Sequence, residues 1–346
     1  MTIQSTNIAI GPAPKERPNR YRGPLQNDPY IVLDLTGAII AIRNGEPAVL
    51  VVNGEHPTGT GVDQLPSGWF MPGAHDSLDA GFRDCVRERT GLELGYAEQL
   101  CTFGASGAAA GDEQSRVVSI GYLALVLGSD GAVEPNCAWR SAYEYFPWED
   151  WRNNRPAVLA DEIEPHLRDW IQSRIAAGDS SALEQREQLV IAFGLDGARW
   201  DDERVLERYD FMWNAGLVAE RKAAVGHHGS ATRPCFGRPM AGIHRRMLAA
   251  ALGRLRAKIR YRPVVFELMQ NEFTLFDLQR TVEAILGPHL HKQNFRRLVE
   301  SIGLVEPTGD IRTHTGGRPA KLYRFRREVL LERPAPGVRV KTVARG

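Results

Sequence analysis

Residues 291–302 constrain the fold of this chain more than any other segment, because they divide into two faces at helical spacing. The apolar face consists of Phe295, Leu298, Val299 and Ile302. Long hydrogen-bond donors fill other positions, namely Lys292, Gln293, Asn294, Arg296 and Arg297. A helix that reads DNA needs this division, since one face packs on its own domain while Arg reaches guanine and Asn or Gln reaches adenine in the major groove. The segment is therefore our candidate recognition helix.

The surrounding sequence has the outline of a winged helix-turn-helix domain. Helical patterns at 264–269 and 275–286 precede the candidate recognition helix, and Thr274 with Asp277 is expected to form a capping box in which Asp replaces the usual Glu. A β-hairpin is expected to follow, with a strand at 304–306, a turn at 307–309, a tip at 312–319 and a return strand at 321–326. Two glycines in the tip let the backbone approach phosphates closely. Candidate DNA contacts in this wing are Arg312, Thr313, His314, Thr315, Arg318 and Lys321.

Charge is distributed unevenly along the chain. Residues 242–333 hold 18 Lys and Arg against 9 Asp and Glu, a net charge of +9, although the whole chain carries only +1. The residues after 333 add three positive charges, so residues 1–241 carry −11. An acidic body joined to a basic module favours one part that binds a polyanion and another that avoids it. The alternatives are a random imbalance of surface charge and a solvated basic helix face.

The first half of the chain predicts a mixed α/β domain. Apolar, β-branched runs predict strands at 31–35, 38–42, 48–52, 97–103 and 117–127, with a hairpin turn at 43–47. Ser77 is a candidate N-cap for a helix that carries Phe82, Cys85 and Val86 on one face, and Gly91 is expected to end it. A second helix is expected at 162–175.

The middle of the chain is less regular. Residues 205–217 predict a helix, and residues 226–230 predict a loop whose His227 and His228 have no Cys or carboxylate at metal-ligand spacing. A long helix is expected from 243 to 260, because apolar residues recur there at every fourth position. Its basic residues Arg245, Arg254 and Arg256 are predicted to project from the other faces. This helix could transmit a signal between the domains or simply pack them together.

Five segments of the basic module share a further pattern: ALGRLR at 251–256, YRPVVFEL at 261–268, FTLFDLQR at 273–280, NFRR at 294–297 and GGRPAKLY at 316–323. Together they resemble the C-terminal domain of the Nudix-related transcriptional regulators of NAD metabolism. The resemblance implies a DNA-binding winged helix in a homodimer that binds a palindromic operator in double-stranded DNA. The chain length and the additional middle segment look more like the branch that controls de novo NAD biosynthesis through quinolinate.

The same resemblance implies a Nudix-like fold for the first domain, and segments 98–104 and 116–125 are also similar to the family. A Nudix box supplies an Arg-Glu pair and then a Glu-Glu pair from one helix, which hold magnesium against a diphosphate. With Gly91 in register, these positions fall on Asp84, Cys85, Glu88 and Arg89, so one carboxylate of three remains. Placing the first pair on Arg87 and Glu88 moves Gly91 out of register and leaves the second acidic pair missing. We therefore expect no catalytic and no metal-binding residues.

The resemblance further implies that this domain senses NAD, ADP-ribose or ATP as an effector and requires no cofactor. A nucleotide site needs cations or helix N-termini for the diphosphate. The candidate effector-binding residues are Arg43, Gly73, Arg87, Glu88 and Arg116. Each of them could also be an ordinary surface residue.

We therefore predict an α/β Nudix-like N-terminal domain plus a C-terminal winged helix-turn-helix domain. The expected parts are a flexible N-terminal arm (1–23), an effector-sensing domain (24–177), a partly helical linking segment (178–242), a linker helix with the winged helix (243–330) and a flexible tail (331–346). The predicted function is a DNA-binding transcriptional repressor of NAD biosynthesis genes that is not an enzyme. The alternatives are a Nudix-type nucleotide-diphosphate hydrolase with an accessory nucleic-acid-binding domain, and an RNA-binding protein.

Two features of the sequence predict a cytoplasmic location without a membrane partner. No run approaches the roughly 18 apolar residues that a membrane span needs. The four cysteines, Cys85, Cys101, Cys137 and Cys235, are widely separated and form no zinc motif or disulfide framework.

Overall fold

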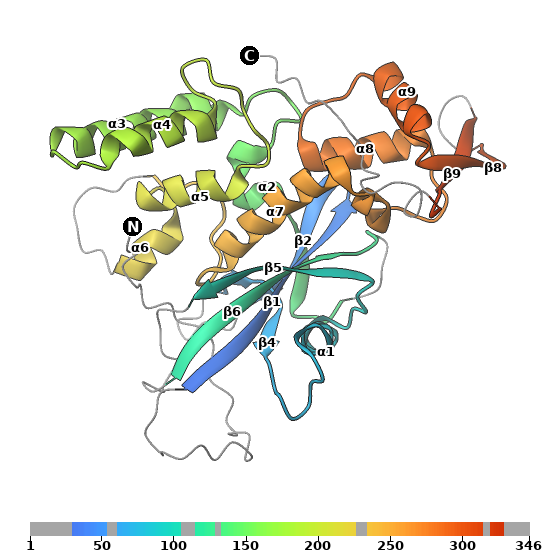
Figure 1. The fold of residues 1–346 in the computed structure, drawn as a ribbon, viewed down its shortest axis with the longest axis horizontal. Helices are drawn as coiled ribbons and strands as arrows, with labels where there is room; N and C mark the ends of the chain where they lie inside the picture. Colours follow the sequence, from blue (N-terminus) through green and yellow to red (C-terminus); the bar gives the residue numbers. More distant parts are fainter. Residues whose placement is uncertain are drawn as a thin grey trace.

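One mixed sheet forms the centre of the N-terminal half (Figure 1). The computed structural model describes residues 30–53, 61–104, 115–128, 133–225, 234–313 and 319–328. The strand order is β3-β2-β1-β6-β5, with β4 paired to β1 and β7 paired to β2. Only β1 and β6 are parallel among the described strand pairs of this sheet. The strands are β1 (Tyr30–Arg43), β2 (Glu46–Asn53), β3 (Asp63–Gln64), β4 (Ser67–Trp69), β5 (Tyr96–Gly104), β6 (Ser115–Leu125) and β7 (Cys137–Ser141).

Helices cover both faces of the sheet. On one face lies α1 (Leu78–Thr90), whose Phe82 and Val86 pack in a cluster with Ile39 and Leu50 of the sheet. On the other face, α7 (His244–Tyr261) contacts β1, β5 and β6. Figure 1 shows these two helices on opposite sides of the strands. This α–β–α layering confirms the α/β class that the sequence predicts for the N-terminal domain.

The two runs predicted as the first strands are one continuous strand. β1 pairs with β6 in an unbroken register from Tyr30 to Ile40. Gly37 lies in the middle of β1 because α1 approaches closely there: a Cβ at this position would lie 2.5 Å from the ring of Phe82. The hairpin turn that follows is confirmed, since Asn44 and Gly45 both have positive φ angles, as a tight two-residue turn requires.

The predicted boundaries of α1 are confirmed at both ends. The Ser77 side chain accepts a hydrogen bond from the Ala80 backbone N–H at 3.1 Å, as an N-cap does. At the other end, Gly91 adopts a left-handed conformation with φ 74° and donates its N–H to the Arg87 carbonyl. Both ends of α1 could be predicted to the exact residue, because each cap depends only on residues that are close in the sequence.

The segment between the sheet and α7 is mostly helical. The helix predicted at 162–175 is α3, which a π-helical turn extends at its start, and the helix predicted at 205–217 is the shorter α5. Figure 1 shows α3 and α4 side by side at the end of the molecule away from the C-terminal strands. The elements are α2 (Ala142–Tyr145), the 3₁₀ turn η1 (Pro147–Glu149), the π turn η2 (Leu159–Ile163), α3 (Glu164–Ala176), α4 (Ala182–Phe193), α5 (Val205–Asn214) and α6 (Ala219–Val225). The loop with His227 and His228, the N-terminal arm and the C-terminal tail lie outside the described residues.

The long helix α7 confirms the apolar periodicity, but the prediction for its arginines was wrong in two of three cases. Arg254 is exposed, as expected. Arg245 and Arg256 are completely buried. Arg245 donates to the carbonyls of Tyr145 and Phe236 and pairs with Glu220 at 3.2 Å. Buried guanidinium groups need such partners, because an unpaired charge in the core is very costly.

Arg256 belongs to a buried ion cluster that joins four parts of the chain. Glu149, which is completely buried, accepts hydrogen bonds from Arg208 of α5 at 2.6 and 3.0 Å and from Arg256 at 2.6 Å. Arg256 also donates to the Ile285 carbonyl at 2.9 Å, in the C-terminal module. Burial disfavours the charged carboxylate, but the two guanidinium groups outweigh burial and hold the pKa of Glu149 below its usual value. We call Glu149, Arg208 and Arg256 the buried ion cluster.

The C-terminal module has the helices of the predicted winged helix. They are the 3₁₀ turn η3 (Val264–Leu268), α8 (Leu275–Leu286) and α9 (Lys292–Ile302), followed by the hairpin of β8 (Val305–Arg312) and β9 (Ala320–Phe325). The capping box is confirmed: Thr274 Oγ1 accepts from the Asp277 N–H, and Asp277 accepts from the Thr274 N–H. The turn predicted at 307–309 was wrong, because these residues form a bulge within β8, where the register with β9 shifts. Gly309 permits the bulge with φ 95°.

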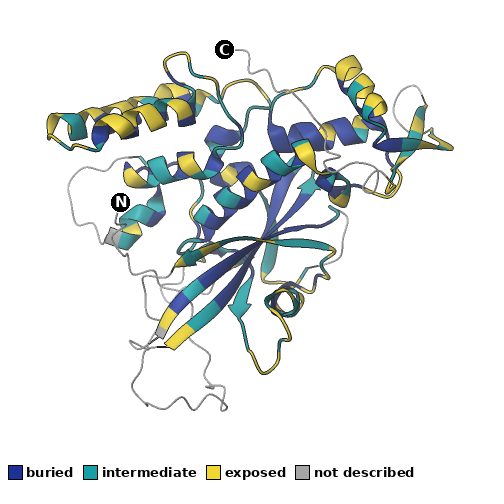
Figure 2. Cartoon of the chain, in the orientation of Figure 1, coloured by how far each residue is buried: buried dark blue, intermediate teal, exposed yellow. Residues whose placement is uncertain are grey.

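A single apolar core extends from the sheet into the winged helix. The cluster contains Ile40 and Val49 of the sheet, Leu252 of α7, and Val282 and Val299 of α8 and α9. Figure 2 shows the buried character of α7 and α8 against the largely exposed α9. Among the described helices, none is long and apolar enough to cross a membrane. The C-terminal module is thus joined to the body by packing and not only by the chain.

We predict that Glu149→Gln lowers the free energy of unfolding by about 3–5 kcal/mol, because two buried guanidinium groups lose their counter-charge. Urea unfolding followed by tryptophan fluorescence measures the change. The control is Glu207→Gln, which removes the same charge from a surface pair with Arg204 and should cost at most about 1 kcal/mol. Equal losses in both variants would contradict the importance of the buried ion cluster.

A second prediction concerns His244, at the start of α7, whose Nδ1 accepts a hydrogen bond from the Leu65 N–H at 2.8 Å. Burial lowers the pKa of His244 to about 4 from its ordinary value of 6.5. Between these two pH values the unfolded chain takes up a proton that the folded chain does not. The free energy of unfolding therefore decreases by about 3 kcal/mol as the pH is lowered from 6.5 to 4. His244→Asn keeps an acceptor for Leu65 and should remove this part of the pH dependence. An unchanged pH profile of the unfolding free energy in the variant would show that His244 does not titrate in this way.

Candidate nucleic-acid interface and sensing domain

Helix α9 presents two opposite faces, as the sequence predicted. Phe295 and Val299 are buried in the core that α9 shares with α8, and Leu298 and Ile302 pack against it. The candidate DNA contacts all lie on the exposed side: Lys292, Gln293, Asn294, Arg296 and Arg297. Figure 2 shows this exposed side as a largely yellow helix at the edge of the molecule. The structure therefore brings five of the predicted contacts together on one helix surface.

The wing lies beside this helix and is tied to the core at its base. Phe273 and Tyr323 exchange two backbone hydrogen bonds, so the chain before α8 adds to the edge of β9. The rings of Phe266 and Phe325 stack at 4.3 Å. Thr313 and Lys321 are exposed on the hairpin. His314, Thr315 and Arg318 lie outside the described residues.

Arg312 has a structural partner that the sequence analysis missed. Its Nη1 donates at 2.9 Å to Oδ2 of Asp277, the carboxylate that also completes the capping box of α8. Both side chains are partly exposed, at 41% and 37%. The two residues lie far apart in the sequence, and no local signal indicates the pairing. Arg312 therefore joins the wing to the N-terminus of α8, in addition to any phosphate that it contacts.

A crevice separates the winged helix from one end of the sheet. The sheet side of the crevice is formed by the ends of β1 and β6, and the other side by η3, the start of α8 and the Arg312–Asp277 pair. Its lining residues include Ile42, Leu127, Gly128, Met269 and Phe273. This end of the sheet therefore lies next to the start of α8 and the Arg312–Asp277 pair, which hold the wing.

Helix α1 carries the residues that the sequence alignment on Gly91 placed at Nudix-box positions, and these residues lie in different environments. Cys85 is buried in the α1–sheet interface, where burial raises the pKa of its thiol to about 12. Glu88 and Arg89 are exposed. Asp84 accepts a hydrogen bond from Arg87 at 2.5 Å. In the alignment on Gly91, a thiol held neutral by burial and a cation stand at two positions where a magnesium site needs carboxylates.

Comparison with known proteins identifies the C-terminal module. The family described as the NrtR DNA-binding winged helix domain matches residues 265–325. Those residues include η3, α8, α9 and both strands of the wing. Residues 265–325 form an NrtR-type winged helix domain. The predicted winged helix-turn-helix is thereby confirmed, and with it the resemblance to the Nudix-related regulators of NAD metabolism.

A curated relative is similar over part of the chain. The ADPR responsive transcriptional repressor NtrR of Acinetobacter baylyi is 44% identical over 82 residues. The match covers 24% of this chain and 32% of the relative, so it spans about a third of the length of that protein.

Solved structures with a similar overall course have low sequence identity. Shewanella oneidensis NrtR complexed with a 27mer DNA is 20% identical, with a TM-score of 0.49 over 86% of this chain and 94% of that one. A MutT/nudix family protein from Enterococcus faecalis is 13% identical, with a TM-score of 0.48 over 88% and 89%. The local match of the NrtR-type winged helix domain remains the stronger finding.

The predicted effector-binding residues lie in separate places. Arg43, at the end of β1, lies over the ring of Trp139 at 5.3 Å. Arg116 pairs in register with Ile31 at the opposite end of β1, which puts it roughly 35–40 Å from Arg43 at about 3.3 Å per residue. Gly73 precedes α1, whereas Arg87 and Glu88 are exposed on its last turns. One nucleotide cannot contact Arg43 and Arg116 together, so the five residues do not form one site.

The structure also reveals a buried carboxyl group beside α1. Asp34 of β1 is 4% exposed and accepts hydrogen bonds from the hydroxyl groups of Thr36 at 2.7 Å and Ser119 at 3.1 Å. Burial raises the pKa of Asp34, and the two hydroxyl donors only partly oppose this effect. The burial of Asp34 was not predictable from the sequence, because an Asp within an apolar strand pattern predicts exposure.

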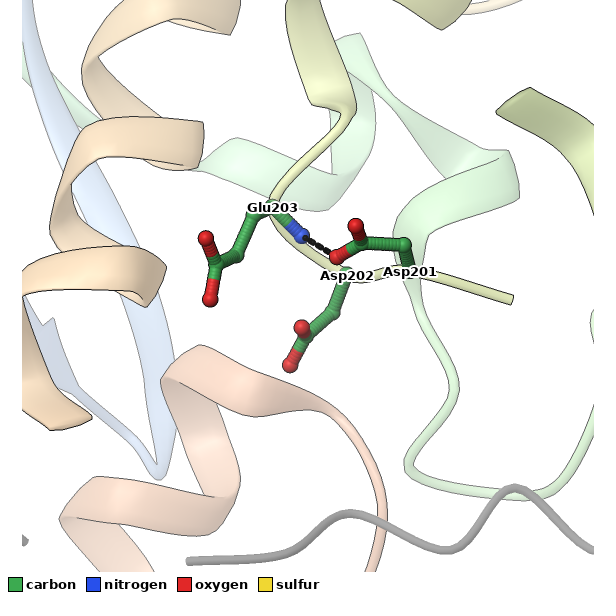
Figure 3. A group of neighbouring side chains, drawn as sticks. All are labelled: Asp201, Asp202 and Glu203. Carbon is green, nitrogen blue, oxygen red and sulfur yellow. Dashed lines mark hydrogen bonds between the residues drawn. The ribbon is translucent and has the colours of Figure 1, made fainter. Parts of the chain in front are cut away.

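One acidic cluster outside the Nudix-like helix has the spacing of a cation site. Among the described residues, Asp201, Asp202 and Glu203 form the group whose ligand atoms approach one another within 4.8 Å (Figure 3). Arg260 donates to Asp202 at 2.6 Å and to Glu203 at 3.1 Å, and Arg204 donates to Asp201 at 3.3 Å. Each of the three carboxylates is paired with one of two guanidinium groups, so the cluster serves as an ion-pair network between the linking segment and α7.

Proposed function

We propose that this protein is a DNA-binding transcriptional repressor of NAD biosynthesis genes. The observation that carries the proposal is the exposed face of α9, whose five long donors lie on an NrtR-type winged helix domain. The relative from Acinetobacter baylyi is named as a transcriptional repressor, and its similarity lies in a segment of 82 residues. The net charge of +9 on residues 242–333 supplies the attraction to phosphates that such binding needs.

The Nudix-like domain is proposed to sense an NAD-related nucleotide, namely NAD, ADP-ribose or ATP. The name of the Acinetobacter baylyi relative, which is ADPR responsive, supports a nucleotide effector of this class. Arg43, Gly73, Arg87, Glu88 and Arg116 remain the proposed contacts, divided between alternative places on the domain. No cofactor is required in this proposal, and the protein acts in the cytoplasm. The additional helices of the linking segment favour the branch that controls de novo NAD biosynthesis.

Regulation would act through a homodimer on a palindromic operator. Two recognition helices must be a fixed distance apart to enter successive major grooves. A nucleotide that changes this distance weakens DNA binding, and by reciprocity DNA then weakens nucleotide binding by the same factor. Gel-shift titration of the protein on its own upstream regions, with NAD, ADP-ribose and ATP added in turn, tests both halves of the proposal.

We predict that Arg297→Ala weakens operator binding about tenfold to a hundredfold, because one two-bond contact to a base is worth about 1–3 kcal/mol. Binding of the effector nucleotide should not change. Fluorescence anisotropy with the upstream DNA fragment that the wild-type protein binds in the gel-shift titration measures the operator affinity. Calorimetry measures the affinity for the effector nucleotide. The matched control is Arg186→Ala, which removes the same charge from an exposed position on α4. Wild-type affinity in Arg297→Ala would contradict the assignment of α9 as the recognition helix.

The Nudix-like domain is proposed not to hydrolyse its nucleotide. The buried thiol of Cys85 and the cation of Arg89 support this, because neither binds magnesium as a carboxylate does. We expect no magnesium-dependent turnover of ADP-ribose or NAD above the level of Glu88→Gln, measured by product chromatography. Turnover that is present in the wild type and lost in Glu88→Gln would establish the alternative, a nucleotide-diphosphate hydrolase.

A further inference from the structure

Two buried polar side chains of α8 hold the connection that leads into α9. Gln279 and Glu283 are 7% and 5% exposed and lie one helical turn apart. Both contact Leu290, which lies just before α9 begins. Gln279 Nε2 donates to the Leu290 carbonyl at 2.9 Å, and the Leu290 N–H donates to Glu283 Oε1 at 2.9 Å. Gln279 Nε2 also donates to Glu283 Oε1 at 2.8 Å, which closes the arrangement. We call Gln279 and Glu283 the Leu290 clamp.

The clamp fixes the start of α9 in place of a capping side chain. His291 is the N-cap residue of α9, and its side chain makes no capping hydrogen bond. Both polar groups of the Leu290 backbone are bound by the clamp, so neither of the two peptide planes that flank Leu290 can rotate without breaking a hydrogen bond to a buried side chain. The direction in which α9 leaves the connection is therefore set by α8. The chain also turns sharply before it, at Gly287 with φ 96°.

The same part of α8 is fixed to the body of the protein. Tyr143 donates its hydroxyl to the Ala284 carbonyl at 2.7 Å, and Arg256 of the buried ion cluster donates to the Ile285 carbonyl at 2.9 Å. Gly287, at the end of α8, lies against Trp151. The body thus holds α8, and α8 holds Leu290 through the clamp.

We propose that Gln279 and Glu283 are positioning residues that determine the sequence specificity of DNA binding. This inference rests on the proposed DNA-binding function. Contacts to phosphates are made by long, flexible cations and tolerate a small displacement of α9. Contacts to base edges need aligned donors and acceptors, so they are lost when the helix shifts. Loosening the clamp should therefore reduce the preference for the operator while leaving non-specific binding intact.

His289 also lies near the carboxylate of Glu283 but does not bind Leu290. His289 Nδ1 lies 3.4 Å from Glu283 Oε2, the oxygen that does not bind Leu290, and His289 is 62% exposed. Because the Leu290 N–H needs an acceptor and not a charge, the amide oxygen of a glutamine at position 283 serves equally well.

The experiment measures the ratio of operator affinity to affinity for a scrambled duplex of the same composition. Fluorescence anisotropy is carried out on the full-length protein with the upstream fragment that the wild type retains. We expect Gln279→Leu and Glu283→Leu each to lower this ratio about tenfold or more, the equivalent of losing at least one base contact. The affinity for the scrambled duplex and its salt dependence should stay at wild-type values. Circular dichroism confirms that each variant is folded.

Two control variants separate positioning from a general loss of structure. Tyr143→Phe removes a buried hydrogen bond to α8 but leaves the Leu290 clamp, and should lower the melting temperature without changing the affinity ratio. Glu283→Gln keeps the acceptor and should restore the wild-type ratio. An unchanged ratio in folded Gln279→Leu would overturn the inference, as would an equal loss in Tyr143→Phe or in Glu283→Gln. A wild-type protein that prefers no genomic fragment would instead overturn the proposed function.

Discussion

The buried contact of Glu149 with two arginines is the constraint on which the arrangement of this protein depends. A carboxylate without water is unfavourable unless charges and donors surround it, and here they come from α5 and α7. The indole ring of Trp200 covers Arg208 at 3.8 Å, and main-chain carbonyls accept further guanidinium hydrogens of both arginines. Apolar packing is not directional, whereas the hydrogen bonds of the buried ion cluster require defined distances and angles. The cluster therefore fixes the relative positions of the sheet domain, the linking segment and α7.

Because Arg256 also donates a hydrogen bond to α8, the winged helix is held to the body by buried contacts and not only by the connecting chain. α7 contacts the sheet, α5 and α8, and its buried face lies in the same apolar core as α9. These contacts favour the simpler of the two roles considered for α7, in which it packs the domains together. In the proposed homodimer, a nucleotide that regulates DNA binding would then move whole protomers relative to each other more easily than it would move the winged helix within one protomer.

Local sequence signals predicted most of the elements correctly. The caps of α1 and the capping box of α8 involve neighbouring residues, and the two faces of α9 follow from helical periodicity alone. Errors arose where the deciding partner is distant in the sequence. Arg245 and Arg256 were predicted only to project away from the apolar stripe of the helix. Their burial depends on Glu220 and Glu149, which lie far away along the chain. The bulge at Pro307–Gly309 looked like a turn because both use the same residue types.

The candidate DNA face was predictable for a related reason, whereas the nucleotide site was not. All five donors belong to α9, so helical periodicity alone gives their relative positions from their spacing in the sequence. The candidate effector residues lie on different strands and on α1, and their separation depends on strand direction. β1 and β6 run parallel, which places Arg116 and Arg43 at opposite ends of the sheet. Asp34 and the Leu290 clamp are polar groups in apolar patterns, and only the three-dimensional structure reveals their partners.

The carboxylate of Asp277 has two roles, and this has a consequence for how such domains diverge. A single oxygen accepts hydrogen bonds from the Thr274 main chain and from Arg312. A substitution at position 277 therefore disturbs a helix start and a hairpin base at once, whereas a substitution at 312 leaves an acidic group without its partner. In an alignment of homologous domains these two columns should covary, so that positions 277 and 312 are exchanged as a pair during evolution.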